Sequence, residues 1–213
     1  MNNLQKRILT SLIALPVSIF FVVKGGYLLI FFLIFILFAG MHELFSVFKK
    51  IQSILFLSLI LILSLFCIYY LSEKQPLLLY FVIAVTISSD IGGYVFGKIF
   101  KWKKLTKISP KKTISGVFGS YFCSFICIIV FNELSGSSSH GFLVSGLTVI
   151  PEVLLTIIFS TVAQAGDLVI SYFKRLEKIK DTGKILPGHG GIFDRIDGLM
   201  FVAILAFVLV LLS

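Results

Sequence analysis

The chain has 213 residues, 58% of them hydrophobic, and a mean hydropathy of +1.06. Soluble domains are about 45–50% apolar, so this composition excludes an ordinary water-soluble protein. The apolar excess lies in long runs, which indicates a polytopic membrane protein. The net charge of +9 would suit nucleic-acid binding in a soluble protein, but here the basic residues lie between apolar runs, so we expect no nucleic-acid partner.

Seven apolar runs are candidates for membrane helices. A helix needs roughly 20 residues to cross a hydrocarbon core of about 30 Å. The runs cover residues 8–23, 27–47, 54–71, 76–96, 116–131, 151–173 and 198–212. We therefore predict an all-α, polytopic integral membrane protein with about seven transmembrane helices, within a range of six to eight. It is expected to form a single transmembrane domain over residues 1–213, with N-terminal spans at 8–71 and a further portion at 76–213 that carries the candidate functional residues.

One shorter run, at residues 142–150, is too short to cross a membrane alone. We expect it to extend the sixth span, with Pro151 as a kink or as a first-turn residue of that helix. If the run crossed separately, the number of spans would be even. The last basic loop would then move to the opposite side of the membrane, so we disfavour that arrangement.

The Lys and Arg residues fall almost entirely on one side of the predicted arrangement. Seventeen of the nineteen lie in the N-terminal segment or in the connections after the second, fourth and sixth spans, and only Lys24 and Lys74 lie on the other side. Cytoplasmic loops carry the excess of Lys and Arg. We therefore place the N-terminus and the basic loops in the cytoplasm and the protein in the cell inner (plasma) membrane.

The fourth span carries an acidic residue, Asp90, beside a stripe of small residues. Ser89, Gly93 and Gly97 repeat every four residues, a pattern that lets two helices pack closely. An ionisable residue in or near a membrane span is a functional hypothesis by default. The alternative is that Asp90 pairs with a nearby lysine at a helix interface.

A compact basic segment precedes the fifth span. Ser109, Pro110, Lys111, Lys112 and Thr113 follow one another, and Pro110 disfavours helix just before it. Two lysines and a hydroxyl group therefore stand at the start of a helix, where free N–H groups and the positive dipole end favour phosphate. The alternative is a basic loop that only sets the orientation in the membrane.

The end of the sixth span places four polar residues on one helical face. Asp167, Ser171, Lys174 and Arg175 stand at i, i+4, i+7 and i+8. A carboxylate, a hydroxyl group and two cations are thus aligned from within the membrane toward the cytoplasm. A polar helix end of no function would not place Asp167 about one turn deep with this alignment.

The link between the sixth and seventh spans is rich in glycine and charge. It contains Asp181, His189, Asp194, Arg195 and Asp197. Glycines allow unusual backbone angles and a close approach to a ligand, and Asp194 and Asp197 share a face if the seventh span begins near them. The segment is not a Walker P-loop, because GxxxxGK[ST] is absent.

These groups combine carboxylates for a divalent cation with Lys and Arg for phosphates, at one membrane face. Aspartate oxygens suit Mg²⁺, which usually binds through one or two carboxylates plus substrate phosphates. Phosphoryl and nucleotidyl transfer depend mostly on positioning and charge neutralisation, which such a set supplies. We expect a nucleotide from the cytoplasm and an anionic lipid from the leaflet as substrates.

The link also carries a long signature. The pattern S-x-x-K-R-x-x-x-x-K-D-x-G-x-x-L-P-G-H-G-G-x-x-D-R-x-D runs unbroken over residues 171–197, and it resembles the signature of phosphatidate cytidylyltransferases (CDP-diacylglycerol synthases). The segments at 90–94, 109–113 and 166–168 also fit that family. The resemblance implies that CTP and phosphatidate, with Mg²⁺, give CDP-diacylglycerol and pyrophosphate for phospholipid biosynthesis. The sequence does not determine the oligomeric state, and a homodimer is one possibility.

The resemblance also implies roles for individual residues. Two aspartates match the family's metal ligands, Asp167 and Asp194. The residues implied to be catalytic are Asp167, Lys174, Arg175, Asp181, His189, Asp194, Arg195 and Asp197. Those implied to bind substrate are Asp90, Ser109, Lys111, Lys112, Thr113 and Ser171. His189 is not assigned as a general base, because the phosphate of the lipid is already largely ionised.

Two other functions remain as alternatives. A CTP-dependent lipid kinase of the polyprenol type would use a similar site, but it would transfer the γ-phosphate and release CDP. An ion-coupled transporter would be expected to show inverted repeats and a site at the membrane midplane. The sequence shows no repeat, and its polar residues gather at the cytoplasmic end.

Overall fold

The structure is a computed structural model of the chain, and it describes residues 3–106, 108–135, 151–179, 181–183 and 190–212. Its described residues form seven α-helices. They are α1 (Asn3–Lys24), α2 (Gly26–Val47), α3 (Ile51–Lys74), α4 (Pro76–Phe100), α5 (Ile114–Ser135), α6 (Glu152–Leu176) and α7 (Phe193–Leu212). Six of the seven predicted runs lie within one of these helices, and the run at 151–173 begins one residue before α6, which confirms the all-helical fold class.

Six of these helices, α2 to α7, are long and apolar enough to cross a membrane. In α1, the part whose side chains are described, Leu12–Lys24, is apolar but shorter. Large apolar side chains such as Tyr27, Phe31 and Phe38 are exposed on the outside of the molecule, where a bilayer would cover them. The chain is therefore a polytopic membrane protein.

The main differences from the sequence prediction are at helix ends. α7 begins at Phe193, not at residue 198, so Asp194, Arg195 and Asp197 all lie on its first turns. Pro151 is the N-cap that precedes α6, so it neither kinks the helix nor lies in its first turn. The run at 142–150 lies outside the described residues, so its predicted place in the sixth span stays a prediction.

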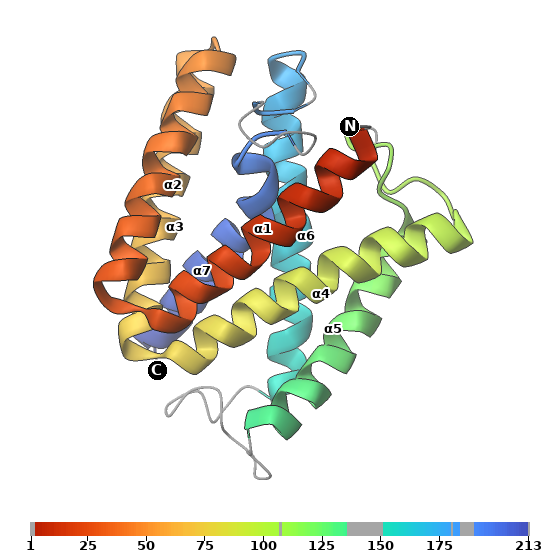
Figure 1. The fold of residues 1–213 in the computed structure, drawn as a ribbon. Helices are drawn as coiled ribbons and strands as arrows, with labels where there is room; N and C mark the ends of the chain where they lie inside the picture. Colours follow the sequence, from red (N-terminus) through yellow and green to blue (C-terminus); the bar gives the residue numbers. More distant parts are fainter. Residues whose placement is uncertain (1–2, 107, 136–150, 180, 184–189, 213) are drawn as a thin grey trace.

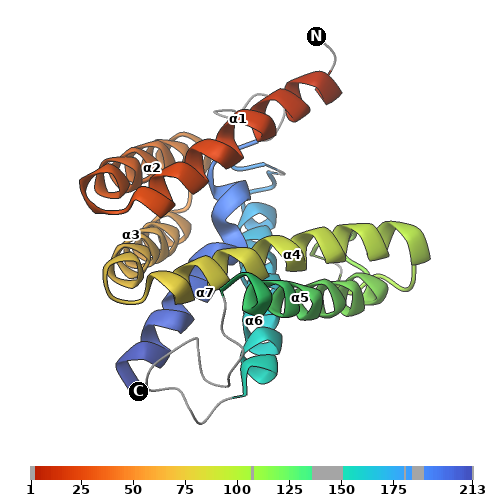
Figure 2. The ribbon, with the colours of Figure 1, turned by 60° about the horizontal axis from the view of Figure 1, so that its bottom comes forward.

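The helices are arranged around α6 and α7. Figures 1 and 2 show these two helices between the α2–α3 pair and α5, while α4 crosses from the α3 side to the α5 side. α7 packs against α3, α4 and α6. Its buried face is made of small and apolar residues, Phe193, Met200, Val202, Ala203 and Ala206. The first turn of α7 is thereby held among elements that come from most of the chain.

Three links between helices meet at one end of the bundle. Glu177, at the end of α6, accepts hydrogen bonds from the backbone N–H groups of Lys49 and Lys50 at 3.3 and 3.0 Å. Arg175 donates from Nε to the carbonyl oxygen of Ile108, 3.3 Å away. The connections after α2, α4 and α6 therefore lie on one side. This is the parity that the distribution of Lys and Arg predicts.

Glu177 lies outside the membrane-spanning segments. Desolvation raises the pKa of its carboxyl group, but hydrogen bonds from the backbone N–H groups of Lys50 and Lys49 and from the Ser53 side chain, with the charge of Lys50, together hold the pKa below its ordinary value. The carboxylate is therefore ionised at neutral pH, and in that form it joins the end of α6 to the connection between α2 and α3.

Glycines bring α4 and α5 into backbone contact. We call this contact between the two helices, around Gly92 and Gly119, the α4–α5 seam. A Cβ atom added at Gly92 would overlap the carbonyl group of Gly119, and one at Gly93 would lie 2.8 Å from Ser120 Oγ. Ser120 in turn donates a hydrogen bond to the carbonyl oxygen of Ser89 at 2.7 Å. The predicted small-residue stripe is confirmed as a helix-packing surface, and it fixes the place where α5 begins.

Candidate active site

The first pair of the site joins the segment before α5 to α6. Lys112 Nζ lies 2.7 Å from Asp167 Oδ2 and donates to the carbonyl oxygen of Gln164 at 2.9 Å. Ser171, one turn further along α6, donates from Oγ to Asp167 Oδ1 at 3.4 Å. The predicted face of α6 and the predicted basic segment are therefore in contact.

The segment around Lys112 is shaped by its own backbone. Lys104 and Thr113 form an isolated antiparallel bridge, and the N–H group of Leu105 donates to the carbonyl oxygen of Lys112 at 2.8 Å. Thr113 Oγ1 accepts the N–H group of Gly116 at 3.1 Å, as an N-cap residue of α5 does. Lys112 is thus presented just before a helix N-terminus, as the sequence predicts.

Two further carboxyl groups converge on Asp167. The side chains of Asp167 and Asp197 are in hydrogen-bonding contact. Asp90, on α4, is close enough to interact electrostatically with Asp167, Lys112 and Arg195. Carboxyl groups this close repel one another unless a proton or a cation lies between them. The residues of four separate segments therefore form one acidic cluster with basic neighbours.

A glycine allows α6 and α7 to approach at this point. A Cβ atom added at Gly166 would lie only 2.5 Å from the ring of Phe201. Because Gly166 precedes Asp167, the close approach brings Asp167 toward the first turns of α7, where Asp197 stands. Close packing of α6 against α7 therefore explains why glycine precedes Asp167 in the sequence.

Asp194 forms a second, more buried pair. Its Oδ1 atom lies 2.8 Å from Lys174 Nζ, and the two side chains are 8% and 10% exposed. Its Oδ2 atom accepts the N–H groups of Thr182 and Gly191 at 2.9 and 3.1 Å. A buried ion pair is stable when hydrogen bonds satisfy its remaining lone pairs. Lys174 also interacts electrostatically with Asp167, so the two pairs are neighbours.

A carboxylate that the sequence prediction missed lies beside this pair. Glu43, on α2, is 1% exposed and accepts the N–H group of Ile192 on both oxygens, at 2.9 and 2.8 Å. It also accepts the N–H group of Phe193 at 3.3 Å. A signal for it was present, because Glu43 is an acidic residue inside an apolar run.

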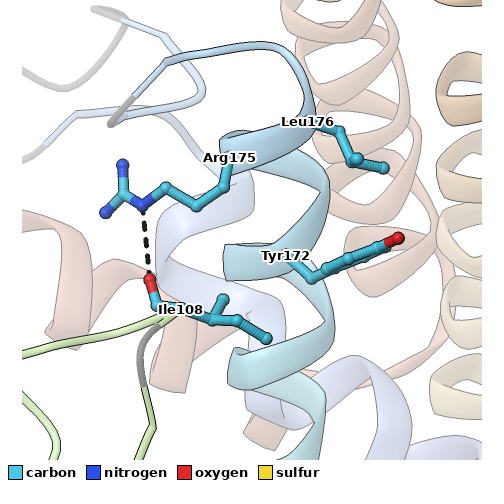
Figure 3. A pocket seen from close by; sticks show the side chains of 4 residues that line it. All are labelled: Ile108, Tyr172, Arg175 and Leu176. Atoms are coloured by element: carbon cyan, nitrogen blue, oxygen red, sulfur yellow. Dashed lines mark hydrogen bonds between the residues drawn. The ribbon is translucent and has the colours of Figure 1, made fainter.

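The side chain of Arg175 bonds to backbone carbonyl groups. Its guanidinium group donates to the carbonyl oxygens of Ile108 and Ile179. It borders an open cavity of about 400 Å³ that Ile108, Tyr172 and Leu176 also line. Figure 3 shows Tyr172 and Leu176 projecting to one side of α6 and Arg175 to the other. The predicted one-face alignment thus holds for Asp167, Ser171 and Lys174, while Arg175 bonds to the backbone at Ile108 and Ile179.

The remaining predicted residues are at the edge of the site. Lys111, Asp181 and Arg195 are exposed, and Ser109 contributes to the backbone of the basic segment. His189 lies outside the described residues, so its role stays a prediction. The roles given to all of these residues by resemblance are likewise predictions.

The carboxylates of the site include a pair suited to a magnesium ion. Among the described residues, no group of three or more His, Cys, Asp and Glu residues is placed to hold a metal. Mg²⁺ needs only one or two carboxylates when substrate phosphates and water complete its shell. The touching pair Asp167 and Asp197 fits that requirement. Both oxygens of Asp194, the second predicted ligand, accept hydrogen bonds from protein donors.

Fold and site together define a class: a polytopic membrane protein with a cluster of carboxylates and cations where its basic links meet. The comparisons with known proteins then specify the family. Residues 47–213 match the model of the cytidylyltransferase family. The match covers most of the chain, and the chain belongs to this family.

Bacterial relatives agree with this assignment. The chain is 40% identical over 137 residues to a phosphatidate cytidylyltransferase of Staphylococcus epidermidis, which is 63% of this chain and 50% of the relative. It is 41% identical over 143 residues to that of Staphylococcus aureus, 67% and 52% of the two chains. A third such protein, from Staphylococcus haemolyticus, is 41% identical over 140 residues, 64% and 50% of the two chains. The chain thus spans about half the length of these curated relatives.

Proposed function

We propose that this protein is a CTP:phosphatidate cytidylyltransferase, which makes CDP-diacylglycerol and pyrophosphate for phospholipid biosynthesis. The observation that supports it most is the acidic cluster of Asp90, Asp167 and Asp197 with Lys112 and Lys174, in a chain of the cytidylyltransferase family. The named activity of the relatives supports the choice of substrates.

In the proposed reaction, an oxygen of the lipid phosphate forms a bond to the α-phosphorus of CTP. The bond between that phosphorus and the oxygen leading to the β-phosphorus breaks, and pyrophosphate leaves. The lipid phosphate is already mostly ionised near pH 7, since the second pKa of a phosphate monoester is about 6. The protein therefore needs no strong general base at the attacking oxygen, and its task is to position and neutralise phosphates.

The cations of the site divide this task. Lys112 stands at the start of α5, where the helix N-terminus adds a positive field, and with Lys111 it is proposed to hold CTP phosphates. Lys174 pairs with Asp194 and interacts electrostatically with Asp167, and it is proposed to neutralise charge that develops on the leaving group. Arg175 is proposed to contact the lipid phosphate, because it borders a cavity with the apolar side chains of Ile108 and Leu176.

A magnesium ion is proposed as the cofactor. Asp167 is a proposed ligand with Asp197, whose side chain touches it, and Asp194 would join them by releasing one of its hydrogen-bond donors. When bound, the ion would neutralise the triphosphate and polarise the phosphorus that is attacked. We also propose that the site faces the cytoplasm of the plasma membrane, because the basic links that meet around it carry most of the Lys and Arg residues.

The test is a product assay on the purified protein. The protein in detergent micelles receives Mg²⁺, phosphatidate or, in a parallel series, a polyprenol as the acceptor lipid, and CTP labelled at either the α- or the γ-phosphate. The proposal predicts α-label in the lipid and γ-label in pyrophosphate. Label from the γ-phosphate in the lipid, with release of CDP, would instead identify a lipid kinase. If folded protein gives no labelled lipid in either series, both enzymatic functions are contradicted, and the ion-coupled transporter remains as the alternative.

A further inference from the structure

A carboxylate from the second helix reaches the first turn of the seventh. Glu43 is 1% exposed, and its two oxygens lie 2.8 and 2.9 Å from the backbone nitrogen of Ile192. One of them also lies 3.3 Å from the nitrogen of Phe193, the first residue of α7. Glu43 therefore bonds directly to the backbone at the start of α7, to residues that follow it by 149 and 150 positions in the sequence.

Two acidic side chains, Asp194 and Glu43, accept hydrogen bonds from different backbone N–H groups near the start of α7. Asp194 accepts those of Thr182 and Gly191, and Glu43 accepts the next two, from Ile192 and Phe193. The first N–H groups of a helix have no partner within the helix, and negative charge is favourable there. Glu43 therefore acts as a cap for α7 that another helix supplies.

Two glycines of the link make room for this side chain. A Cβ atom added at Gly183 would lie 2.6 Å from Glu43 Oε1, and one added at Gly191 would overlap Thr182 Oγ1 and lie 2.5 Å from Glu43 Oε2. The Thr182 side chain lies beside the same carboxylate. The backbone on both sides of residues 184–189 is thus folded against Glu43, which explains why glycine occupies these two positions.

A buried carboxylate is costly unless it is hydrogen-bonded, and here the bonds go to the backbone that carries the site. The turn to which Glu43 bonds leads directly into Asp194, which pairs with Lys174, and into Asp197, which contacts Asp167. Glu43 itself precedes residue 47, where the match to the family model begins.

We propose that Glu43 is a positioning residue of the active site: it fixes the start of α7, so that Asp194 and Asp197 meet their partners, without touching substrate. The proposal rests on the proposed cytidylyltransferase function for its kinetic consequence. The structural consequence, order at residues 190–193, does not depend on which reaction the site performs. The competing reading is that Glu43 only holds α2 to the bundle.

The experiment compares Glu43→Gln and Glu43→Ala with a matched control, Glu177→Ala. Glu177 is also a carboxylate that joins helices by accepting two backbone N–H groups, but it acts on Lys49 and Lys50, away from α7. Each variant is measured for folded yield and thermal unfolding in detergent, for kcat and KM with CTP, and for hydrogen–deuterium exchange in the peptide covering residues 190–200.

Glu43→Ala is expected to lower kcat per folded molecule by about 10–100-fold, the range seen when a supporting side chain of a site is removed. KM for CTP, measured at saturating Mg²⁺, should change much less, because Asp194 and Asp197 are proposed to hold the ion, whereas Lys112 and Lys111 are proposed to hold the CTP phosphates. Exchange at residues 190–193 should rise. Glu43→Gln should fall between Ala and the natural protein, because its amide keeps one acceptor and turns an NH₂ group toward the backbone donors. Glu177→Ala should leave kcat and exchange at 190–193 unchanged.

Two results would overturn the proposal. One is folded Glu43→Gln protein with natural kcat and natural exchange, which decides the matter even if Glu43→Ala does not fold. The other is a lower folded yield with natural kcat per folded molecule, as a role in packing alone would give. If the natural protein makes no CDP-diacylglycerol, the proposed function fails, whereas the exchange measurement still decides whether Glu43 orders α7.

Discussion

Aspartates that look alike in the sequence have different surroundings in the structure. The Asp194–Lys174 pair is almost fully buried, whereas in the Lys112–Asp167 pair the side chains are 22% and 31% exposed. Removing one partner of a buried pair leaves an uncompensated charge, which costs about 3–5 kcal/mol, while a partly exposed pair contributes about 1 kcal/mol or less. One substitution should therefore have different effects at the two positions.

We expect Asp167→Asn and Asp194→Asn each to abolish turnover with normal expression, because each removes a charge that the proposed site uses. Asp194→Asn should also lower the unfolding temperature by about 6–20 °C, at about 2–4 °C per kcal/mol for a chain of this size. Asp167→Asn should change it by a few degrees at most. Thermal unfolding in detergent and the product assay measure both effects. Equal unfolding temperatures would contradict the burial argument, and near-natural turnover in either variant would remove that residue from the site.

Much of the site could be predicted at the scale of residues, because spacing along one helix is visible in the sequence. Asp167, Ser171 and Lys174 share a face of α6 as their intervals require. Contacts between helices are not encoded in such intervals. That Asp197 would touch Asp167, or that Glu43 would cap α7, depends on how distant segments pack. The partner of Asp194 was missed for the same reason, since Lys174 lies on another helix.

At the scale of helices, the α4–α5 seam sets the position of Lys112. The two backbones touch at Gly92 and Gly119, so α5 cannot slide along α4 without a clash or a gap. Lys112 stands two residues before α5, and its contact with Asp167 depends on where that helix begins. The sequence pattern at Gly93 and Gly97 predicted close packing, but it did not show which helix would be the partner.

Two neighbouring glycines of the seam provide a matched comparison. An added Cβ atom at Gly92 meets backbone, which cannot move aside, whereas at Gly93 it meets the end of the Ser120 side chain. Gly92→Ala should therefore cost about 1–3 kcal/mol, as overpacking does, and lower turnover by displacing Lys112. Gly93→Ala should have the smaller effect on both. Unfolding temperature and kcat measure the difference, and a larger effect at Gly93 would show that the seam does not hold α5 in this way.

For the whole molecule, the meeting of three links at one end determines the topology. The bonds from Glu177 to Lys49 and Lys50, and from Arg175 to Ile108, require the connections after α2, α4 and α6 to share a side. The apolar runs and the positions of Lys and Arg along the sequence predicted this parity. Which side faces the cytoplasm comes only from the counts of Lys and Arg, because both orientations would have the same internal contacts.

The orientation can be tested by labelling single cysteines in intact cells. In a background with Cys67, Cys123 and Cys127 replaced by alanine, Lys103→Cys and Lys74→Cys place a thiol at opposite ends of α4. A membrane-impermeant maleimide should label Lys74→Cys in intact cells and Lys103→Cys only after lysis. Labelling in the reverse order would invert the topology and place the site outside the cytoplasm.

Both lysines that face the acidic groups already have partners. Lys112 is bound to Asp167 and Lys174 to Asp194, so a phosphate that takes either lysine deprives an aspartate of its cation. Magnesium, in the proposed reaction, is the natural replacement at that aspartate. Nucleotide and ion are then linked by an exchange of partners, and each should raise the affinity of the protein for the other by the same factor. Such a site would bind the nucleotide without magnesium, or magnesium without the nucleotide, more weakly than it binds the two together.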